Sequence, residues 1–383
     1  MNNSTLNYTF QTGFCAVTLE SDKEKALKTL AYCCMLLLSI TGNCLVITVV
    51  FKNLSMQTTV NYLIVNMAVS DLLQSSIAIP RNIVEIYYGS TRWFIAGKAG
   101  DLFCKCVPFF TDISTAVSIL SLVIIAFDRF LGVVFPMRAS IISKRMHSVN
   151  MAFTWIIAMG FHAPYFFAFH VEVHGTSQCF YSWDPLPAES ARIYFLVTSI
   201  SLYFFPLALL LILYSTILVK LTRRKTPGNS SFRTQQRISK RNRSVVRMVL
   251  AVVVVFALCW LPINTYVYLS FFYWTPQELS CFTKLYFWGK FVAYSNTALT
   301  PFLYFLFSQN YRQGLKYLFC GQVATLKTSI HTRPRNDYEG GRETSLSESK
   351  SKPWAKYGRN LKSPHSSTLS DNQYNCIPRF AFR

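Results

Sequence analysis

The chain has 383 residues, of which 51% are hydrophobic and 14% are charged, against about 25% charged residues in a typical soluble domain. Its mean hydropathy is +0.27, and its formal net charge is +21 at pH 7. This composition argues against an ordinary soluble domain and favours a membrane protein.

Seven apolar stretches account for most of the first 311 residues. A membrane-spanning helix needs about 20 mostly apolar residues. Five of the stretches contain no Asp, Glu, Lys or Arg, namely 29–51, 148–169, 193–219, 248–277 and 291–311. The other two stretches contain one charge each, Asp71 in 59–79 and Asp112 in 106–127. We therefore predict membrane helices at about 26–51, 58–87, 100–134, 146–169, 190–222, 238–273 and 284–307.

Positive charge gathers in alternate connections between these spans. The segment 220–247 contains ten Lys or Arg and no acid, and thirteen more basic residues follow residue 311. The positive-inside rule therefore predicts an N-terminus outside the cell and a cytoplasmic C-terminus. The predicted parts are an extracellular N-terminus at 1–25, a seven-helix bundle at 26–308, an amphipathic membrane-surface helix at 309–320 and a disordered cytoplasmic tail at 321–383.

The segments outside the spans suggest partners and modifications. The basic cluster at 220–247 connects two spans, so no nucleic-acid partner is expected. Anionic lipid of the inner leaflet and an acidic cytosolic partner both fit its charge, and both interpretations stay open. Asn2, Asn3 and Asn7 each begin an N-x-Ser/Thr sequon, which predicts glycosylation on an outer N-terminus. Cys320 ends the amphipathic segment and is a candidate for palmitoylation.

Short motifs follow one another along the spans, about one in each helix. They are GN at 42–43, NMAVSD at 66–71, Trp93, Cys104, DRF at 128–130, Trp155, Pro206 with Tyr214, CWLP at 259–262 and TPFLY at 300–304. Over about residues 26–320 the chain thus resembles a rhodopsin-like (class A) G-protein-coupled receptor. The resemblance implies an all-α membrane protein, a seven-transmembrane helix bundle with a short amphipathic eighth helix.

The resemblance also implies residues that change conformation on activation. The set expected to face the G protein is Asp128, Arg129, Phe130, Tyr214 and Tyr304, and the expected rotamer switch beneath the ligand is Trp260 with Pro262. At rest Asp128 would hold Arg129 locally. This switch needs a permanent cation with several donors, which Arg supplies and Lys does not. The family often places a further acid near the base of the sixth helix to hold the arginine, but that region, SKRNRS at 239–244, contains no acid. We therefore expect measurable signalling without ligand.

Asp71 is a charged residue in the middle of a span, where such groups usually mark function. In receptors that the chain resembles, an acid at this position holds a sodium ion. The matching polar partners are Ser118, Asn296, Thr300 and Asn43. Thr300 stands where the family usually has Asn, and a protonated Asp71 that binds only water is the alternative.

The resemblance implies a disulfide between Cys104 and Cys179, and the outer location of both residues permits it. Cys15 and Cys281 are the other plausible outer pair. They would connect the N-terminus to the last outer loop, as in some peptide receptors, and whether they pair is left open.

The resemblance places the ligand between the outer halves of the helices. Amine receptors carry Asp where this chain has Thr111, and opsins carry Lys where it has Tyr294, which argues against a monoamine and against retinal. Pro80, CKCVPFF at 104–110 and a predicted β-hairpin at 170–183 are similar to neuropeptide receptors. The candidate contacts are Arg81, Glu85, Thr111, Asp112, Glu172, Tyr266, Lys290 and Tyr294.

Charge assigns these contacts provisional roles. Asp112 and Glu85 would pair with an Arg of a peptide, whereas Arg81 and Lys290 would meet a carboxylate. Arg81 and Glu85 are also spaced for an ion pair within one helix. Both interpretations remain open at this stage.

The first hypothesis is therefore a plasma-membrane receptor for an extracellular neuropeptide that activates a heterotrimeric G protein. The Ser-rich segments 344–351 and 363–371 would recruit a receptor kinase and arrestin. The sequence contains no pattern of catalytic residues, so no enzyme activity and no cofactor beyond the sodium ion is expected. An amine or lipid ligand is the alternative, and a membrane transporter is a more distant one.

Overall fold

The computed structural model describes residues 20–135, 144–187, 189–223 and 232–320. Its long helices are α1 (Asp22–Lys52), α2 (Thr59–Tyr88), α3 (Gly97–Val134), α4 (Lys144–His162), α6 (Glu189–Ser199) continued by η3 (Ile200–Phe204) and α7 (Phe205–Arg223), α8 (Phe232–Phe272) and α10 (Thr283–Phe307). The shorter elements are η1 (Leu54–Met56), α5 (Tyr165–Ala168), β1 (Phe169–His174), β2 (Thr176–Tyr181), α9 (Pro276–Cys281) and α11 (Gln309–Cys320). One compact unit ends at Lys316, and every contact below lies within it.

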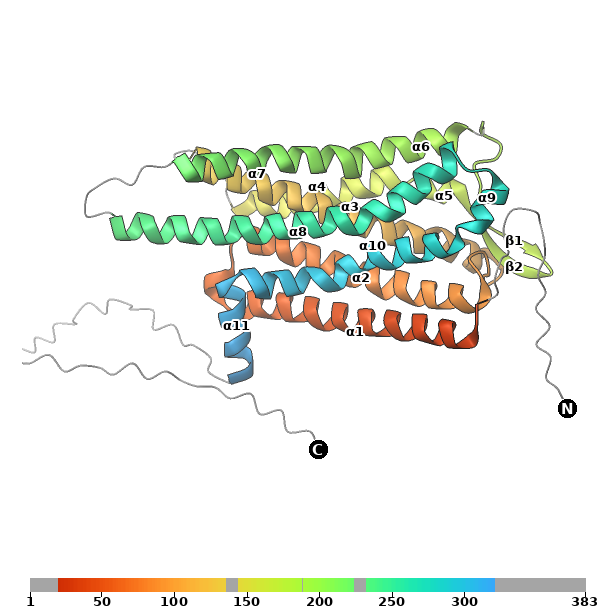
Figure 1. The fold of residues 1–383 in the computed structure, drawn as a ribbon, viewed down its shortest axis with the longest axis horizontal. Helices are drawn as coiled ribbons and strands as arrows, with labels where there is room; N and C mark the ends of the chain where they lie inside the picture. Colours follow the sequence, from red (N-terminus) through yellow and green to blue (C-terminus); the bar gives the residue numbers. More distant parts are fainter. Residues whose placement is uncertain (1–19, 136–143, 188, 224–231, 321–383) are drawn as a thin grey trace, which may run out of the picture. The chain divides into compact units, whose positions relative to one another are not determined.

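The long helices lie side by side and form the predicted seven-transmembrane bundle (Figure 1). In the described part of the chain, six helical stretches are long and apolar enough to cross a membrane. The seventh helix, α10, has 25 residues, and at about 1.5 Å per residue it also exceeds the ~30 Å hydrocarbon thickness of a bilayer.

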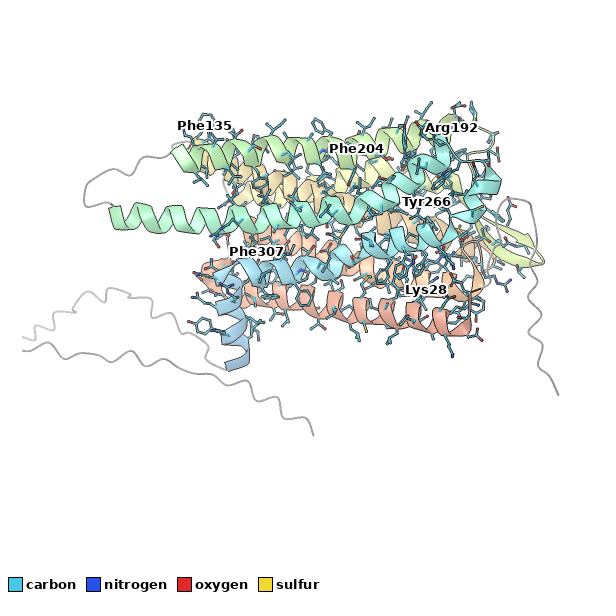
Figure 2. The ribbon with its side chains drawn as sticks, in the orientation of Figure 1. Lys28, Phe135, Arg192, Phe204, Tyr266 and Phe307 are labelled. Carbon is cyan, nitrogen blue, oxygen red and sulfur yellow. A yellow bond between two sulfur atoms is a disulfide. The ribbon has the colours of Figure 1, made fainter. Side chains whose placement is uncertain are left out.

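The bundle has an apolar outer surface, and its largely apolar interior also contains polar residues. Phe204, which Figure 2 labels, is 53% exposed, and Leu211 and Leu258 are each 61% exposed. Asn43 and Asp71, in contrast, are buried. This arrangement is what a lipid solvent requires, because polar groups within a membrane must find partners inside the protein.

Two of the sequence motifs are explained by helix packing. A Cβ atom at Gly42 would lie 2.8 Å from the Cβ of Pro301, so the glycine lets α1 and α10 approach closely. In α2, Asn66 donates from Nδ2 to the Ser121 hydroxyl of α3 at 3.0 Å. Its Oδ1 accepts from the Trp155 indole of α4 at 2.9 Å. One amide thus connects three helices.

Prolines explain where the fourth helix ends and where the fifth span contains a π-helical turn. The fourth helix was predicted to run to residue 169, but α4 ends at His162. Pro164 disfavours helical geometry in the residue before it, and the chain passes through the short α5 into a strand. In the fifth span, Pro206 has no N–H to donate, and the preceding turn widens into the π-helix η3, in which Phe205 N–H donates to the Ile200 carbonyl.

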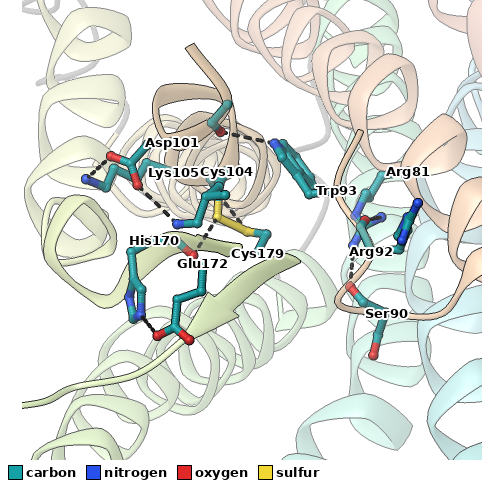
Figure 3. The surroundings of a disulfide bond; sticks show 12 residues. Arg81, Ser90, Arg92, Trp93, Asp101, Cys104, Lys105, His170, Glu172 and Cys179 are labelled. Atoms are coloured by element: carbon teal, nitrogen blue, oxygen red, sulfur yellow. Dashed lines mark hydrogen bonds and ion pairs between the residues drawn. A yellow bond between two sulfur atoms is a disulfide. The ribbon is translucent and has the colours of Figure 1, made fainter. Parts of the chain in front are cut away.

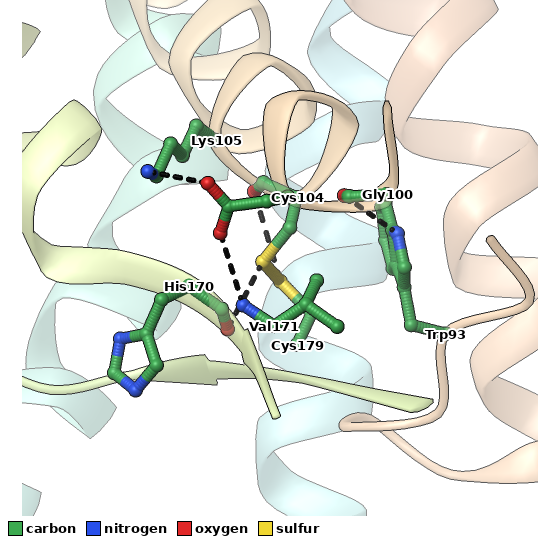
Figure 4. A network of polar contacts seen from close by, with 8 residues as sticks. Trp93, Gly100, Cys104, Lys105, His170, Val171 and Cys179 are labelled. Carbon is green, nitrogen blue, oxygen red and sulfur yellow. Dashed lines mark hydrogen bonds and ion pairs between the residues drawn. A yellow bond between two sulfur atoms is a disulfide. The ribbon is translucent and has the colours of Figure 1, made fainter. Parts of the chain in front are cut away.

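The predicted hairpin is confirmed as the antiparallel pair β1–β2. Gly175 occupies its turn with φ +71°, a backbone conformation that favours glycine. Figure 3 shows the hairpin fastened to the top of α3 by the Cys104–Cys179 disulfide. In Figure 4 the Asp101 carboxylate accepts a hydrogen bond from Val171 N–H at 3.2 Å. The hairpin is therefore held by covalent and polar contacts together.

The connection between α2 and α3 supports the other side of the hairpin. Trp93 N–H donates to the Ser177 carbonyl at 3.0 Å, and Cys179 N–H donates to the Thr91 carbonyl at 2.8 Å. The Trp93 indole donates to the Gly100 carbonyl at 3.0 Å. These contacts fix the hairpin over one end of the helix bundle.

Candidate functional site

A cavity of about 250 Å³ lies between α3, α4–α5, α6–η3 and α8. Its walls carry aromatic rings, several neutral polar groups and one carboxylate, that of Asp112. The Tyr165 hydroxyl donates to Asp112 Oδ2 at 2.6 Å. The His162 ring also borders the cavity and lies 5.4 Å from the Tyr165 ring centre.

Sequence reasoning missed Tyr165 and His162 as site residues. Both lie where the chain turns from α4 into α5 around Pro164. The proline was a local signal for that turn. No local signal, however, indicates that the turn brings a phenol against an acid of α3, which is 53 residues earlier in the chain.

The predicted contacts on α2 and α10 form a separate polar cluster. Glu85 and Lys290 pair at 2.6 Å, and Lys290 lies 4.4 Å from the centre of the Tyr286 ring. Arg81 donates to the carbonyls of Ser90 and Arg92, as part of Figure 3 shows. In the described structure the base that pairs with Glu85 is thus Lys290 of another helix, and not Arg81 of its own helix.

The other four predicted contacts occupy different surroundings. Buried Thr111 donates its hydroxyl to the Val107 carbonyl at 2.8 Å, and exposed Glu172 contacts His170 at 3.0 Å on the hairpin. Tyr266 packs on Tyr286 with 5.0 Å between ring centres. Tyr294 approaches the Trp260 ring edge to face at 6.2 Å. Among the described residues, the cavity lining includes Asp112 but not these four side chains.

Trp260 borders the cavity two residues before Pro262, which lies inside α8. The Trp260 ring lies 6.1 Å from Phe256. Because Pro262 cannot donate a backbone hydrogen bond, α8 is weakened directly beside the tryptophan. This position allows a contact in the cavity to alter the course of α8.

Buried side-chain oxygens lie on α1, α2, α3 and α10, among them those of Asp71. Ser118 donates to its Oδ1 at 3.2 Å, while Asp71 Oδ2, Asn296 Oδ1 and Asn43 Oδ1 have no hydrogen-bond partner in the described structure. Asn43 Nδ2 donates to the Thr297 carbonyl at 3.0 Å, and Thr300 donates its hydroxyl to the Asn296 carbonyl at 2.8 Å. Three unpartnered oxygens, one of them a carboxylate oxygen, fit a small hard cation.

At the opposite end of the bundle Arg129 binds the neighbouring acid. Its Nη2 and Nε donate to Asp128 Oδ2 at 2.5 and 3.0 Å. Phe130 stacks on Phe127 with 6.4 Å between ring centres. The Tyr214 hydroxyl is buried without a partner in the described structure. Arg129 is thus held locally, as the resemblance implies for the resting state.

A second contact at this end connects the sixth and seventh spans. The Ser244 hydroxyl of α8 donates to the Phe307 carbonyl of α10 at 3.0 Å. Tyr304 is buried, reaches the Met67 sulfur at 3.8 Å and stacks on Tyr311 at 5.7 Å. Sequence reasoning missed the Ser244 contact because a lone serine in a basic segment carries no signal for it.

The predicted Cys104–Cys179 disulfide is confirmed, with 5.7 Å between the Cα atoms. Cys281 is also disulfide-bonded; Cys15 lies outside the described residues, so the proposed pairing of these two stays a prediction. The sequons at Asn2, Asn3 and Asn7 and the tail segments also lie outside them. Cys320 ends α11, and its side chain is not among those described.

Seven packed membrane helices with polar residues inside and a cavity at the hairpin end define a seven-transmembrane receptor. The family model for the 7 transmembrane receptor (rhodopsin family) matches residues 42–304, more than half of the chain, and the protein belongs to that family. It is therefore a class A G-protein-coupled receptor.

Similar proteins include receptors named for peptides. The Homo sapiens substance-K receptor is 29% identical over 338 residues, covering 84% of this chain and 82% of that protein. The Mus musculus neuromedin-K receptor is 28% identical over 77% of this chain and 63% of that protein. The tachykinin-like peptides receptor 99D of Drosophila melanogaster is 27% identical over 74% of this chain and 55% of that protein.

Proposed function

We propose that this receptor binds an extracellular peptide at the plasma membrane and activates a heterotrimeric G protein. The observation that carries the proposal is the cavity beneath the hairpin, with one carboxylate, that of Asp112, among aromatic and neutral polar groups. The relatives named for substance K, neuromedin K and tachykinin-like peptides support a peptide ligand.

The proposed mechanism is a shift between two arrangements of the helices. A ligand stabilises the arrangement that it binds more tightly, and only that difference in affinity moves the equilibrium. Contacts with Asp112 on α3 and Trp260 on α8 connect the ligand to two helices that border the cavity. Movement of α8 about Pro262 would break the contact between Ser244 and Phe307 and open the inner end around Arg129 to the G protein.

We also propose a sodium ion bound by Asp71, with the unpartnered oxygens of Asn43 and Asn296 and the Ser118 hydroxyl as neighbours. Their burial and oxygen chemistry support this assignment. A cation there would neutralise the Asp71 carboxylate, which is costly to bury alone, and would favour the helix arrangement in which these oxygens converge.

The proposed topology places the hairpin outside the cell and the inner end, with Arg129, in the cytoplasm. Palmitoylation of Cys320 would add an anchor to the bilayer, and the Ser-rich tail would bind a kinase and arrestin after phosphorylation. Charge supports this topology, because the basic segment 220–247 follows α7.

A calcium assay in cells that express the receptor and a promiscuous G protein tests the proposal. The challenge is a panel of amidated peptides, free-acid peptides, amines and lipids. We expect a response to one peptide class, weakened in Asp112→Asn and retained in Glu189→Gln, a change at the exposed Arg192–Glu189 pair. A response to amines or lipids alone, at normal surface expression, would overturn the peptide assignment.

A further inference from the structure

We infer that the cavity at Asp112 is a guanidinium subsite, which takes an arginine side chain of the ligand. The inference rests on the proposed function and narrows its ligand class. At about 250 Å³ the cavity falls below the ~300–1,000 Å³ typical of small-molecule pockets. It therefore suits one side chain of a longer ligand better than a whole drug-sized molecule.

Among the described residues no Lys or Arg pairs with the Asp112 carboxylate, and the basic side chain that acts on it electrostatically is the His162 imidazole. Asp112 Oδ2 accepts from the Tyr165 hydroxyl, and its Oδ1 has no hydrogen bond to any described residue. Three basic residues near the hairpin end are paired with other acids: Lys290 binds Glu85, Lys105 binds Asp101 and Arg192 binds Glu189. The Asp112 carboxylate is half-buried, and a carboxylate withdrawn from water without a counter-ion is costly. A cation brought by the ligand would therefore bind more favourably here than to a carboxylate in open water.

The neutral polar side chains of the cavity have already used most of their hydrogens. The groups that donate to backbone carbonyls are Thr115 to Thr111 at 3.4 Å, Thr198 to Tyr194 at 2.9 Å, Tyr203 to Ala257 at 2.8 Å and Asn264 to Trp260 at 2.9 Å. What these oxygens can still offer to a ligand is their lone pairs.

His162 adds one more acceptor. Its Nδ1 lies 2.9 Å from the Ala158 carbonyl, which can only accept, so Nδ1 carries the hydrogen. In the neutral ring Nε2 is then an acceptor. Among the lining residues Trp260, Ser199 and, through its second amide hydrogen, Asn264 keep donors without a partner in the described structure, and these suit the carbonyl oxygens of a peptide backbone.

An acceptor-rich cavity selects among cations. Guanidinium offers five N–H donors in a flat fork, whereas ammonium is a compact and strongly hydrated charge with three. The flat group can also stack on aromatic faces. The rings that border the cavity are Tyr165, Phe195, Tyr203, Phe256 and Trp260. Arginine is therefore favoured over lysine, and both over neutral side chains.

The first test uses a peptide agonist from the panel and analogues in which one Arg is replaced by citrulline, which is neutral and of the same shape, or by Lys. In the wild-type receptor we expect citrulline to lower potency by roughly 30-fold or more, since loss of one partner of a buried charge pair costs about 2–5 kcal/mol. The potency of the lysine analogue should lie between those of the arginine and citrulline peptides.

In Asp112→Asn the Arg and citrulline peptides should differ by less than about threefold, while Glu189→Gln keeps the wild-type difference. An equal loss in wild type and Asp112→Asn would overturn the inference. It would also be overturned, with the peptide function intact, if the active peptides carried no Arg.

A second test does not depend on finding the natural ligand. The purified full-length receptor is unfolded by heat with 2-phenylethylguanidine or with its neutral isostere 2-phenylethylurea. The guanidine should raise the midpoint in wild type and in Asp112→Glu, which keeps the charge, but not in Asp112→Asn. Equal effects of the two compounds, or no effect of either, would contradict a guanidinium subsite even if peptides activate the receptor.

Discussion

The Glu85 carboxylate of α2 lies 2.6 Å from the Lys290 ammonium of α10, and the two side chains are only 20% and 10% exposed. The residues are 205 positions apart in the chain. The pair thus joins the second and seventh spans. Because Lys290 is largely buried, its charge depends on this acid for compensation.

Loss of one partner of this pair should destabilise the receptor. Lys290→Met leaves Glu85 buried without a counter-ion, at a cost of about 3 kcal/mol. Heat unfolding of purified receptor should show a lower midpoint for Lys290→Met and for Glu85→Gln, and a double variant less impaired than the sum of the two. Arg192→Met, at an exposed pair, should change little. Additive losses would show that the two side chains do not interact.

Sodium should stabilise the wild-type receptor more than potassium does. A bound ion stabilises the folded state by about 1.4 kcal/mol at a concentration ten times its dissociation constant. Asp71→Asn removes the charge and keeps the shape, so its unfolding midpoint should not distinguish the two salts. Identical midpoints of the wild type in both salts would exclude a sodium site at Asp71.

Ser244→Ala should increase signalling without ligand. The hydroxyl joins α8 to the end of α10, and a neutral hydrogen bond contributes about 1 kcal/mol, which corresponds to roughly a fivefold shift. The matched control is Ser270→Ala, since Ser270 donates to the Val267 carbonyl within the same helix. If both variants or neither raise the basal signal at equal surface expression, the Ser244 contact does not restrain α8.

Gly42→Ala should lower the yield and the thermal stability of the receptor. The added methyl group would lie 2.8 Å from the Pro301 Cβ, and overpacking of this kind costs about 1–3 kcal/mol. Gly160→Ala on α4 meets no atom within 4 Å and should leave the midpoint unchanged or slightly raised. A normal midpoint for Gly42→Ala would mean that α1 and α10 separate without cost.

The membrane helices could be predicted closely because their signal is local. A bilayer demands about 20 consecutive apolar residues, and such runs can be counted along the chain. The hairpin was also visible locally, through Gly175 at its turn. The end of the fourth helix was predicted wrongly at 169 because the effect of Pro164 was underestimated; α4 ends at His162.

In the candidate site, too, local features could be predicted and contacts between helices could not. The motifs located Asp71, Arg129 and Trp260 on their helices, since each motif is a short run of neighbours in the chain. Partners on other helices were not predictable, because they depend on how each helix is rotated and crosses the next. Tyr165 beside Asp112 and Ser244 beside Phe307 are of this second kind.

The sequence by itself determined seven membrane spans, the family and the residues available for the switch and the pocket, because length, hydropathy and motif order are properties of the linear chain. Glu85 shows what it left open: Arg81, four residues away, was the local candidate for its partner. Only the tertiary structure brought Lys290 of α10 to the carboxylate, since that choice depends on how two distant helices face each other.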